Sequence, residues 1–149
     1  MHTADELEII INKHLSSLNK ISEDDFSNKP LPAKWSKKEI MGHLIDSAQN
    51  NIRRFIVSQY EANPLILYNQ DKWVSISNYQ QTESKDIIQL WYLLNKQICV
   101  ILRNTSDEML QRTSKTSAVY SIDWLAKDYV KHLLHHLHVV LDLDPVAYP

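Results

Sequence analysis

Apolar residues recur at spacings of three and four along most of this chain, which is the period of an α-helix with one buried face. This pattern predicts four long helices, and polar helix-capping residues mark their starts. Ser36 and Glu39 have the spacing of a capping box, in which each side chain satisfies the other's free backbone N–H. Thr3 and Ser121 are expected to cap the first and last helices. The four helices are expected at about residues 3–18, 37–60, 83–104 and 122–143.

The segments between these helices differ in length and composition. Residues 27–32 contain two prolines and are expected to form a linker. Residues 61–81 are the least regular part, and we expect a long connection with one short helical turn. Residues 105–120 are polar and form a second expected connection. Four helices in a chain of 149 residues predict an all-α protein, with one four-helix-bundle domain over residues 1–149. The long second connection would allow a crossover.

Composition excludes several classes of protein. The single glycine, Gly42, argues against a β-rich fold, a phosphate-binding glycine loop and a dinucleotide-binding fingerprint. The net charge of -2 shows no basic bias, so neither nucleic acid nor a membrane is an expected partner. The single cysteine, Cys99, cannot form an intramolecular disulfide and lies in an apolar run, which indicates a core residue. With no leader-like or membrane-spanning segment recognised, we expect a cytoplasmic protein.

Histidines are the candidate chemistry of the last helix. His132 and His136 are four residues apart, so they lie one turn apart on the same face as Tyr129. His135 and His138 point to other faces. Two imidazoles on an apolar stripe each need a polar partner, and one shared metal ion would serve both. Spacing alone leaves two readings open, a metal pair or two separately hydrogen-bonded histidines.

His43, in the second predicted helix, is the third candidate ligand. It shares a face with Ser47, Asn50 and Arg54, at spacings of three or four. If the fold brings His43 against the last helix, the chain holds a three-histidine site with open coordination positions, as a catalytic metal requires. The alternative is that this polar stripe is a solvated face. Neutral imidazoles suit zinc, nickel, iron or copper better than calcium or magnesium.

Several neighbouring residues are candidates for supporting roles. Those expected to contact a small-molecule substrate lie within a few turns of the histidines, and Arg54 among them could hold a carboxylate. The carboxylates of Asp46 and Asp128 are candidates to orient the imidazole rings through their second nitrogens. The candidate substrate contacts are Ser47, Asn50, Arg54 and Tyr129.

Two stretches resemble the DinB/YfiT-like superfamily. The run from Trp35 to His43 (WSKKEIMGH) is similar to that family's tryptophan-started second helix, and the run from Asp128 to His138 (DYVKHLLHHLH) is similar to its fourth-helix histidine cluster. The resemblance implies an up-down-down-up four-helix bundle, a homodimer, and a divalent metal held by His43, His132 and His136. His138 stands where many relatives carry glutamine.

The resemblance also implies a range of activities. Characterised relatives include S-transferases that use bacillithiol, mycothiol or glutathione, and a thiol-dependent isomerase; others are described as metal-dependent hydrolases. We therefore expect an enzyme in which zinc or nickel activates a low-molecular-weight thiol or water against a small electrophile. The alternative is a binding or stress-response module with a structural or vestigial metal, with Trp73 and Tyr79 as anchors of a partner surface on residues 61–81. A third reading has no metal at all.

Overall fold

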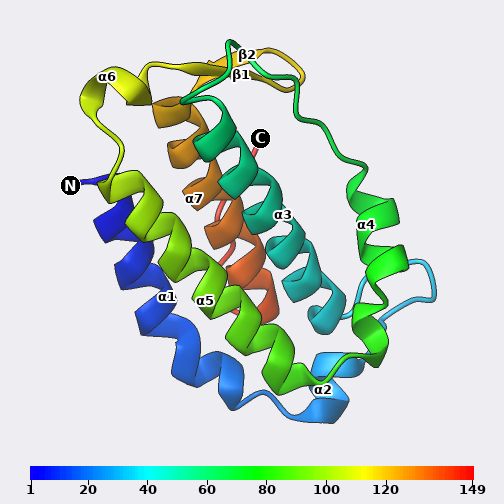
Figure 1. Ribbon diagram of the computed structural model, residues 1–149. Helices are drawn as coiled ribbons and strands as arrows, with labels where there is room; N and C mark the ends of the chain where they lie inside the picture. Colours follow the sequence, from blue (N-terminus) through cyan, green and yellow to red (C-terminus); the bar gives the residue numbers. More distant parts are fainter.

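The computed structural model describes residues 1–149 and consists of four long helices packed as a bundle (Figure 1). The expected all-α four-helix bundle is confirmed, and each long helix begins and ends within three residues of its expected position. These helices are α1 (Thr3–Asn19), α3 (Lys37–Val57), α5 (Ser84–Arg103) and α7 (Ile122–Val140). None of the helices is long and apolar enough to cross a membrane.

The connections hold more structure than local sequence patterns predict. The region after α3 was expected to contain one helical turn, but it contains a two-turn helix, α4, and a 3-10 turn, η1. The polar segment before α7 contains a short helix and a hairpin. The hairpin forms because its two strands pair with each other, and Lys115 also bonds the backbone of Pro64 and Ile66. The short elements are α2 (Glu23–Ser27), α4 (Gln70–Ser77), η1 (Tyr79–Gln81), α6 (Asp107–Leu110), β1 (Thr113–Lys115) and β2 (Val119–Ser121).

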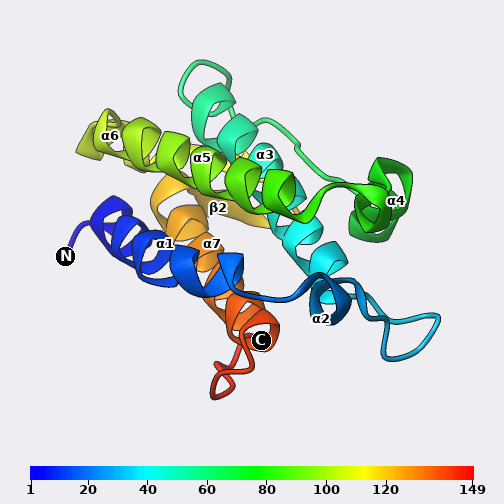
Figure 2. The ribbon, with the colours of Figure 1, turned by 90° about the horizontal axis from the view of Figure 1, so that it is seen from below.

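The bundle has an up-down-down-up topology. Residues 58–83 run back along the bundle outside the helices, so α3 and α5 point the same way, and α1 and α7 point the opposite way (Figure 1). Helix α3 packs against α5 and α7, and α1 packs against the same two helices. Figure 2 shows α4 outside the bundle, on the side away from α1. This arrangement places α3 antiparallel to α7, and these are the two helices that carry the candidate histidines.

The interior is apolar and includes the only cysteine. Trp91, Phe26 and Phe55 are among the largest fully buried side chains. Cys99 is 1% exposed, and its Sγ lies 3.4 Å from the carbonyl oxygen of Ala4. Burial raises the pKa of the Cys99 thiol to about 11, so it stays protonated at neutral pH. The expected core role of Cys99 agrees with this position, since only a thiolate is a good nucleophile.

Two of the three expected helix caps are present, and the third is wrong. The Ser36–Glu39 capping box is present in full, and Ser121 accepts the N–H of Trp124 at 3.1 Å. The expected Thr3 cap is wrong, because Nδ1 of His2 accepts the N–H of Ala4 and Thr3 is already helical. Helix α5 begins after Glu83, whose side chain makes no capping hydrogen bond. Packing of the apolar face of α5 against the bundle stabilises its first turn instead.

Replacing Ser36 with alanine tests how much the start of α3 depends on its cap. Ser36 is fully buried, and its Oγ accepts the N–H of Glu39 at 3.1 Å and donates to Oε1 of Gln80 at 2.6 Å. We expect Ser36→Ala to lower the free energy of unfolding by about 2 kcal/mol, because a cap and a tertiary hydrogen bond are lost together. Urea unfolding measures it. Ser106→Ala, which removes the exposed cap of the short helix α6, is the control and should cost clearly less.

Candidate metal centre

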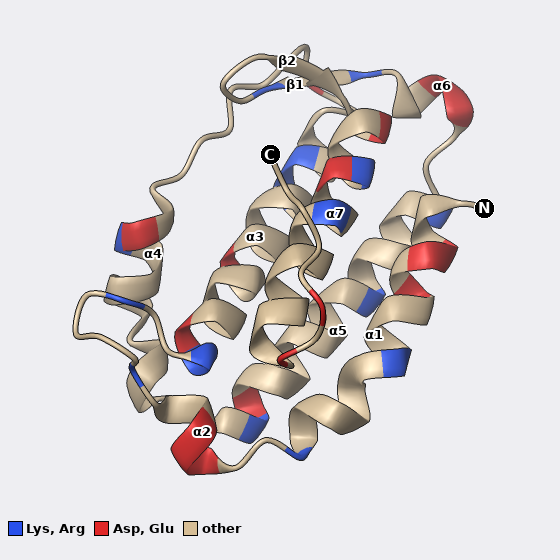
Figure 3. Cartoon of the chain, turned by 180° about the vertical axis from the view of Figure 1, so that it is seen from behind, with Lys and Arg blue, Asp and Glu red and all other residues tan.

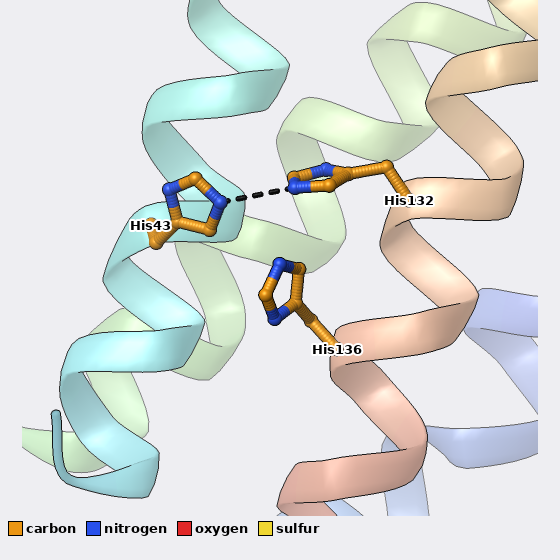
Figure 4. Close-up of side chains that lie close together, drawn as sticks. All are labelled: His43, His132 and His136. Carbon is orange, nitrogen blue, oxygen red and sulfur yellow. Dashed lines mark hydrogen bonds between the residues drawn. The ribbon is translucent and has the colours of Figure 1, made fainter. Parts of the chain in front are cut away.

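Three histidines meet between the antiparallel helices α3 and α7 (Figure 4). His43 extends from α3, and His132 and His136 extend from consecutive turns of α7. The Nε2 atoms of His43 and His132 are 3.0 Å apart, and one nitrogen from each of the three rings lies within 4.8 Å of the others. The structure therefore brings together the three residues that the sequence offered as ligands.

Local sequence places each ring on the inner face. All residues from Met41 to Ala48 are buried, so α3 has no solvated face in this stretch, and His43 is only 1% exposed. On α7, the fully buried Leu133 and Leu137 point into the core, which turns the adjacent His132 and His136 toward α3. The alternative of a solvated polar stripe on α3 is wrong in this region.

The three imidazoles are neutral at physiological pH. Burial, followed by the mutual repulsion of the rings, lowers the pKa of each of His43, His132 and His136 to about 4. Neutral imidazole is the form that ligates metals. Two Nε2 atoms in contact can share at most one proton, so a cation held between the rings would satisfy lone pairs that the protein leaves facing each other. The cluster thus fits a divalent metal by its donor atoms, burial and charge.

Aromatic side chains flank the cluster on two sides. The ring of Trp35 lies 5.0 Å from that of His43, and the ring of Tyr148 lies 5.2 Å from that of His132. Tyr148 belongs to residues 141–149, which turn back along α7 (Figure 3). His135 contacts this segment through Nδ1, 2.6 Å from the carbonyl oxygen of Val146. Nδ1 of His138 contacts the same segment, 2.7 Å from the carbonyl oxygen of Asp144. As expected from helical phase, these two histidines lie outside the cluster.

A cavity of about 230 Å³ adjoins His132. It includes three of the four candidate substrate contacts, Ser47, Arg54 and Tyr129, although the Tyr129 hydroxyl points to Asn95 and donates to it at 2.6 Å. The fourth candidate, Asn50, is buried but does not line this cavity. Its amide bonds the carbonyl oxygen of Asp46 instead. Sequence reasoning missed the lining residues Asn51, Tyr68, Gln70 and Tyr148.

A larger, open cleft of about 720 Å³ lies on the other side of the cluster. His136, His135 and Trp35 line it, together with charged residues from several segments, which are Asp25, Lys34, Lys37, Asp71 and Asp142. Gln70, the first residue of α4, lines both this cleft and the smaller cavity. The cluster therefore has a hollow on the His136 side and another on the His132 side. The connection between α3 and α5 contributes to both, as long loops near functional sites often do.

The candidate orienting carboxylates bond tyrosines rather than histidines. Asp46 accepts the hydroxyl of Tyr79 at 2.6 Å, and Asp128 accepts that of Tyr148 at 2.8 Å. Burial raises the pKa of the Asp46 carboxyl to about 6. Tyr79 is 9% exposed, so it cannot anchor a partner on an exposed surface as the alternative reading required, whereas Trp73 is 37% exposed. Nδ1 of His43 has no partner within the protein.

The buried histidines predict acid sensitivity of the metal-free protein. Their pKa is about 4 in the folded state and about 6.5 when unfolded, so between these values the unfolded chain binds more protons. Stability should be full above pH 6.5 and fall as the pH drops toward 4, by about 1.4 kcal/mol per pH unit for each proton. Asp46 acts in the opposite direction, because its pKa is raised to about 6 in the folded state. Below pH 6 the folded protein therefore binds about one proton more at this carboxyl than the unfolded chain does, which offsets one of the histidine protons.

Urea unfolding of chelator-treated protein at pH 7 and pH 5 measures this effect. The control is His132→Asn, which removes one of the three titrating groups and should reduce the difference between the two pH values. Equal stability of the unmodified chain at both pH values would contradict the neutral, buried state of the cluster.

The fold and the site together define a four-helix bundle of up-down-down-up topology with a three-histidine cluster. The model of the DinB superfamily matches residues 6–140. This chain therefore belongs to the DinB superfamily, as the two sequence stretches indicated.

Known relatives agree with this assignment. A protein of Oceanobacillus iheyensis named "Putative metal-dependent hydrolase" is 28% identical, over 91% of this chain and 86% of that protein. YfiT of Bacillus subtilis, which has the same descriptive name, is 24% identical, over 74% of this chain and 64% of its own length. The solved structure of YfiT, described as a four-helix bundle of unusual topology, superposes with a TM-score of 0.81 at 20% identity, covering 94% of this chain and 82% of that one.

Proposed function

We propose that this protein is a metal-dependent enzyme in which His43, His132 and His136 hold zinc or nickel and a low-molecular-weight thiol is transferred to a small electrophile. The observation that carries the proposal is the cluster of three neutral imidazoles, within 4.8 Å of one another and with no carboxylate among them. Such a set leaves the full positive charge on the metal and keeps coordination positions free.

When bound, the metal would lower the pKa of a coordinated thiol or water toward neutrality. The chain's own residues provide the surroundings. Burial keeps the three rings unprotonated, Trp35 and Tyr148 limit the access of water, and the two hollows give room for the reactants. A less hydrated site strengthens every electrostatic interaction within it.

The surroundings of the cluster favour a thiol over water as the nucleophile. Hydrolysis by a metal-activated water usually relies on a nearby general base. Here Asp46 and Asp128 each accept a tyrosine hydroxyl through one oxygen. The second oxygen of Asp46 is buried without a partner, and no carboxylate bonds a histidine of the cluster. A thiol has an intrinsic pKa of about 8.5 and needs much less assistance to ionise at neutral pH. Hydrolysis is the second candidate, and it is favoured by the descriptive names of the two relatives.

Paired assays on one preparation separate these candidates. Untagged, zinc- or nickel-loaded protein is mixed with an aryl chloride and, in turn, with glutathione, bacillithiol or mycothiol, while an aryl ester without thiol reports hydrolysis. We expect metal-dependent thioether formation with at least one thiol, and its loss in His132→Ala. Ester hydrolysis without thiol dependence would support the second candidate. A fully loaded protein inactive in both assays would overturn the proposal in favour of a non-catalytic module.

A further inference from the structure

We propose that the cavity beside His132 binds an anionic oxygen group of the substrate, a carboxylate or a phosphate, through the guanidinium of Arg54. This inference rests on the proposed function in one respect, since it takes the cavity as the place where the electrophile lies. The cavity is small, at about 230 Å³, and it joins His132 to Arg54 in one space. An anchor there would hold a small substrate next to the metal centre.

Arg54 is held in a fixed orientation and keeps hydrogen-bond donors to spare. Its Nε and Nη2 donate to the carbonyl oxygen of Ile66 at 3.3 and 2.9 Å, and Nη1 donates to Oδ1 of Asn51 at 3.4 Å. The Tyr68 ring lies beside it, with its centroid 5.8 Å from Cζ. A guanidinium has five N–H donors in a rigid fork, so three are used and two remain.

No carboxylate lies within ion-pair distance of Arg54, and the charge of Asp128 acts on it only from farther away. Seven ion pairs within 4.0 Å occur in the protein, and none includes Arg54. Asp128 lines the same cavity, but its Oδ2 accepts the hydroxyl of Tyr148 at 2.8 Å. A half-buried cation without a direct partner is costly, and an incoming anion would offset that cost.

The remaining donors of Arg54 match the acceptors of an oxyanion. The planar fork of arginine binds carboxylate and phosphate oxygens through paired hydrogen bonds. The hydroxyl groups of Ser47 and Tyr68 line the same cavity and can add further donors. Asp128 is the only carboxylate that lines this cavity, and its Oδ2 already accepts the hydroxyl of Tyr148. Together these features select an anionic group over a neutral or cationic one.

The test follows the Arg54 Nε–H signal by NMR in zinc-loaded, ¹⁵N-labelled protein, with propionate and inorganic phosphate as separate probes. The signal is assigned by its absence in Arg54→Gln. We expect a saturable shift with at least one probe, and calorimetry should show binding at least tenfold weaker in Arg54→Gln. The probe that binds tighter identifies carboxylate or phosphate as the preferred group.

Two further variants sharpen the test. Arg53→Gln, at the adjacent and exposed arginine, should bind the probe as the unmodified protein does. Asp128→Asn should bind it more tightly, because a negative charge leaves the cavity while Tyr148 keeps an acceptor. No shift with either probe, or equal binding by the Arg54→Gln variant, would overturn the inference.

The metal content of each sample separates this inference from the proposed function. If the protein retains no metal, the proposed function fails, yet the Arg54 signal still reports whether the anion binds. If the metal is retained and Arg54→Gln binds the probe unchanged, the anion lies elsewhere. The inference then fails while the metal-dependent function stands.

Discussion

His43→Ala and His132→Ala should each abolish stoichiometric metal binding, while His135→Ala should retain it. Removing one of three imidazoles leaves two ligands, and two rarely hold a metal in competition with water and buffer. Loss of a partner that merely orients a ligand already weakens metal affinity by about 10–100-fold. Loss of a ligand should exceed that, so the affinity of either alanine variant should fall by more than about 100-fold.

Elemental analysis of untagged protein, purified without a metal-affinity step and then dialysed against zinc or nickel, measures the effect. His135 is a matched control because it lies on the same helix and its ring is 5.0 Å from that of His136, yet its Nδ1 is directed to Val146. Equal loss of metal in His135→Ala would mean that the ligand set is wrong. Metal retained in both His43→Ala and His132→Ala would exclude the three-histidine site altogether.

Gly42→Ala should destabilise the protein by about 2–4 kcal/mol, although alanine is the better helix former. Within a helix the exchange should gain about 1 kcal/mol. Here, however, an added Cβ would overlap the ring of Tyr79, 2.6 Å from Cε2 and closer still to Cδ2 and Cγ. Moving that ring costs about 1–3 kcal/mol in repacking and breaks the buried hydrogen bond to Asp46, worth a similar amount.

The urea midpoint and slope measure this loss, and Gln49→Ala, an exposed position on the same helix, should change stability by less than about 0.5 kcal/mol. A double-mutant cycle with Tyr79→Ala isolates the overlap, because Gly42→Ala should cost much less once the ring is gone. Increased stability of the single Gly42→Ala variant would show that the Tyr79 ring of η1 can move away from α3 at little cost.

Local sequence determines the long helices and the phase of their residues. The capping box at Ser36 and the apolar periodicity both depend on residues at most four apart, so they can be recognised without a tertiary structure. The same rule separates His132 and His136 from His135. The short elements are different: β1 and β2 depend on pairing, including the bonds of Lys115 to residues of the distant 58–69 segment.

Only the tertiary structure decided whether the candidate residues form a site. His43 and His132 are 89 residues apart, and their contact depends on the antiparallel packing of α3 against α7. The family resemblance supplied the ligand set, whereas helical spacing left the metal and hydrogen-bonded readings open.

The cavity around Arg54 shows the same division more sharply. Its walls come from α3, α7, the long connection and the returning C-terminal residues, among them Tyr68 and Tyr148, which no local pattern distinguishes. Periodicity is a property of neighbours in the chain and is therefore written in the sequence itself. A cavity and its unpaired charge depend on how separate segments pack, so they appear only when the helices and connections are assembled.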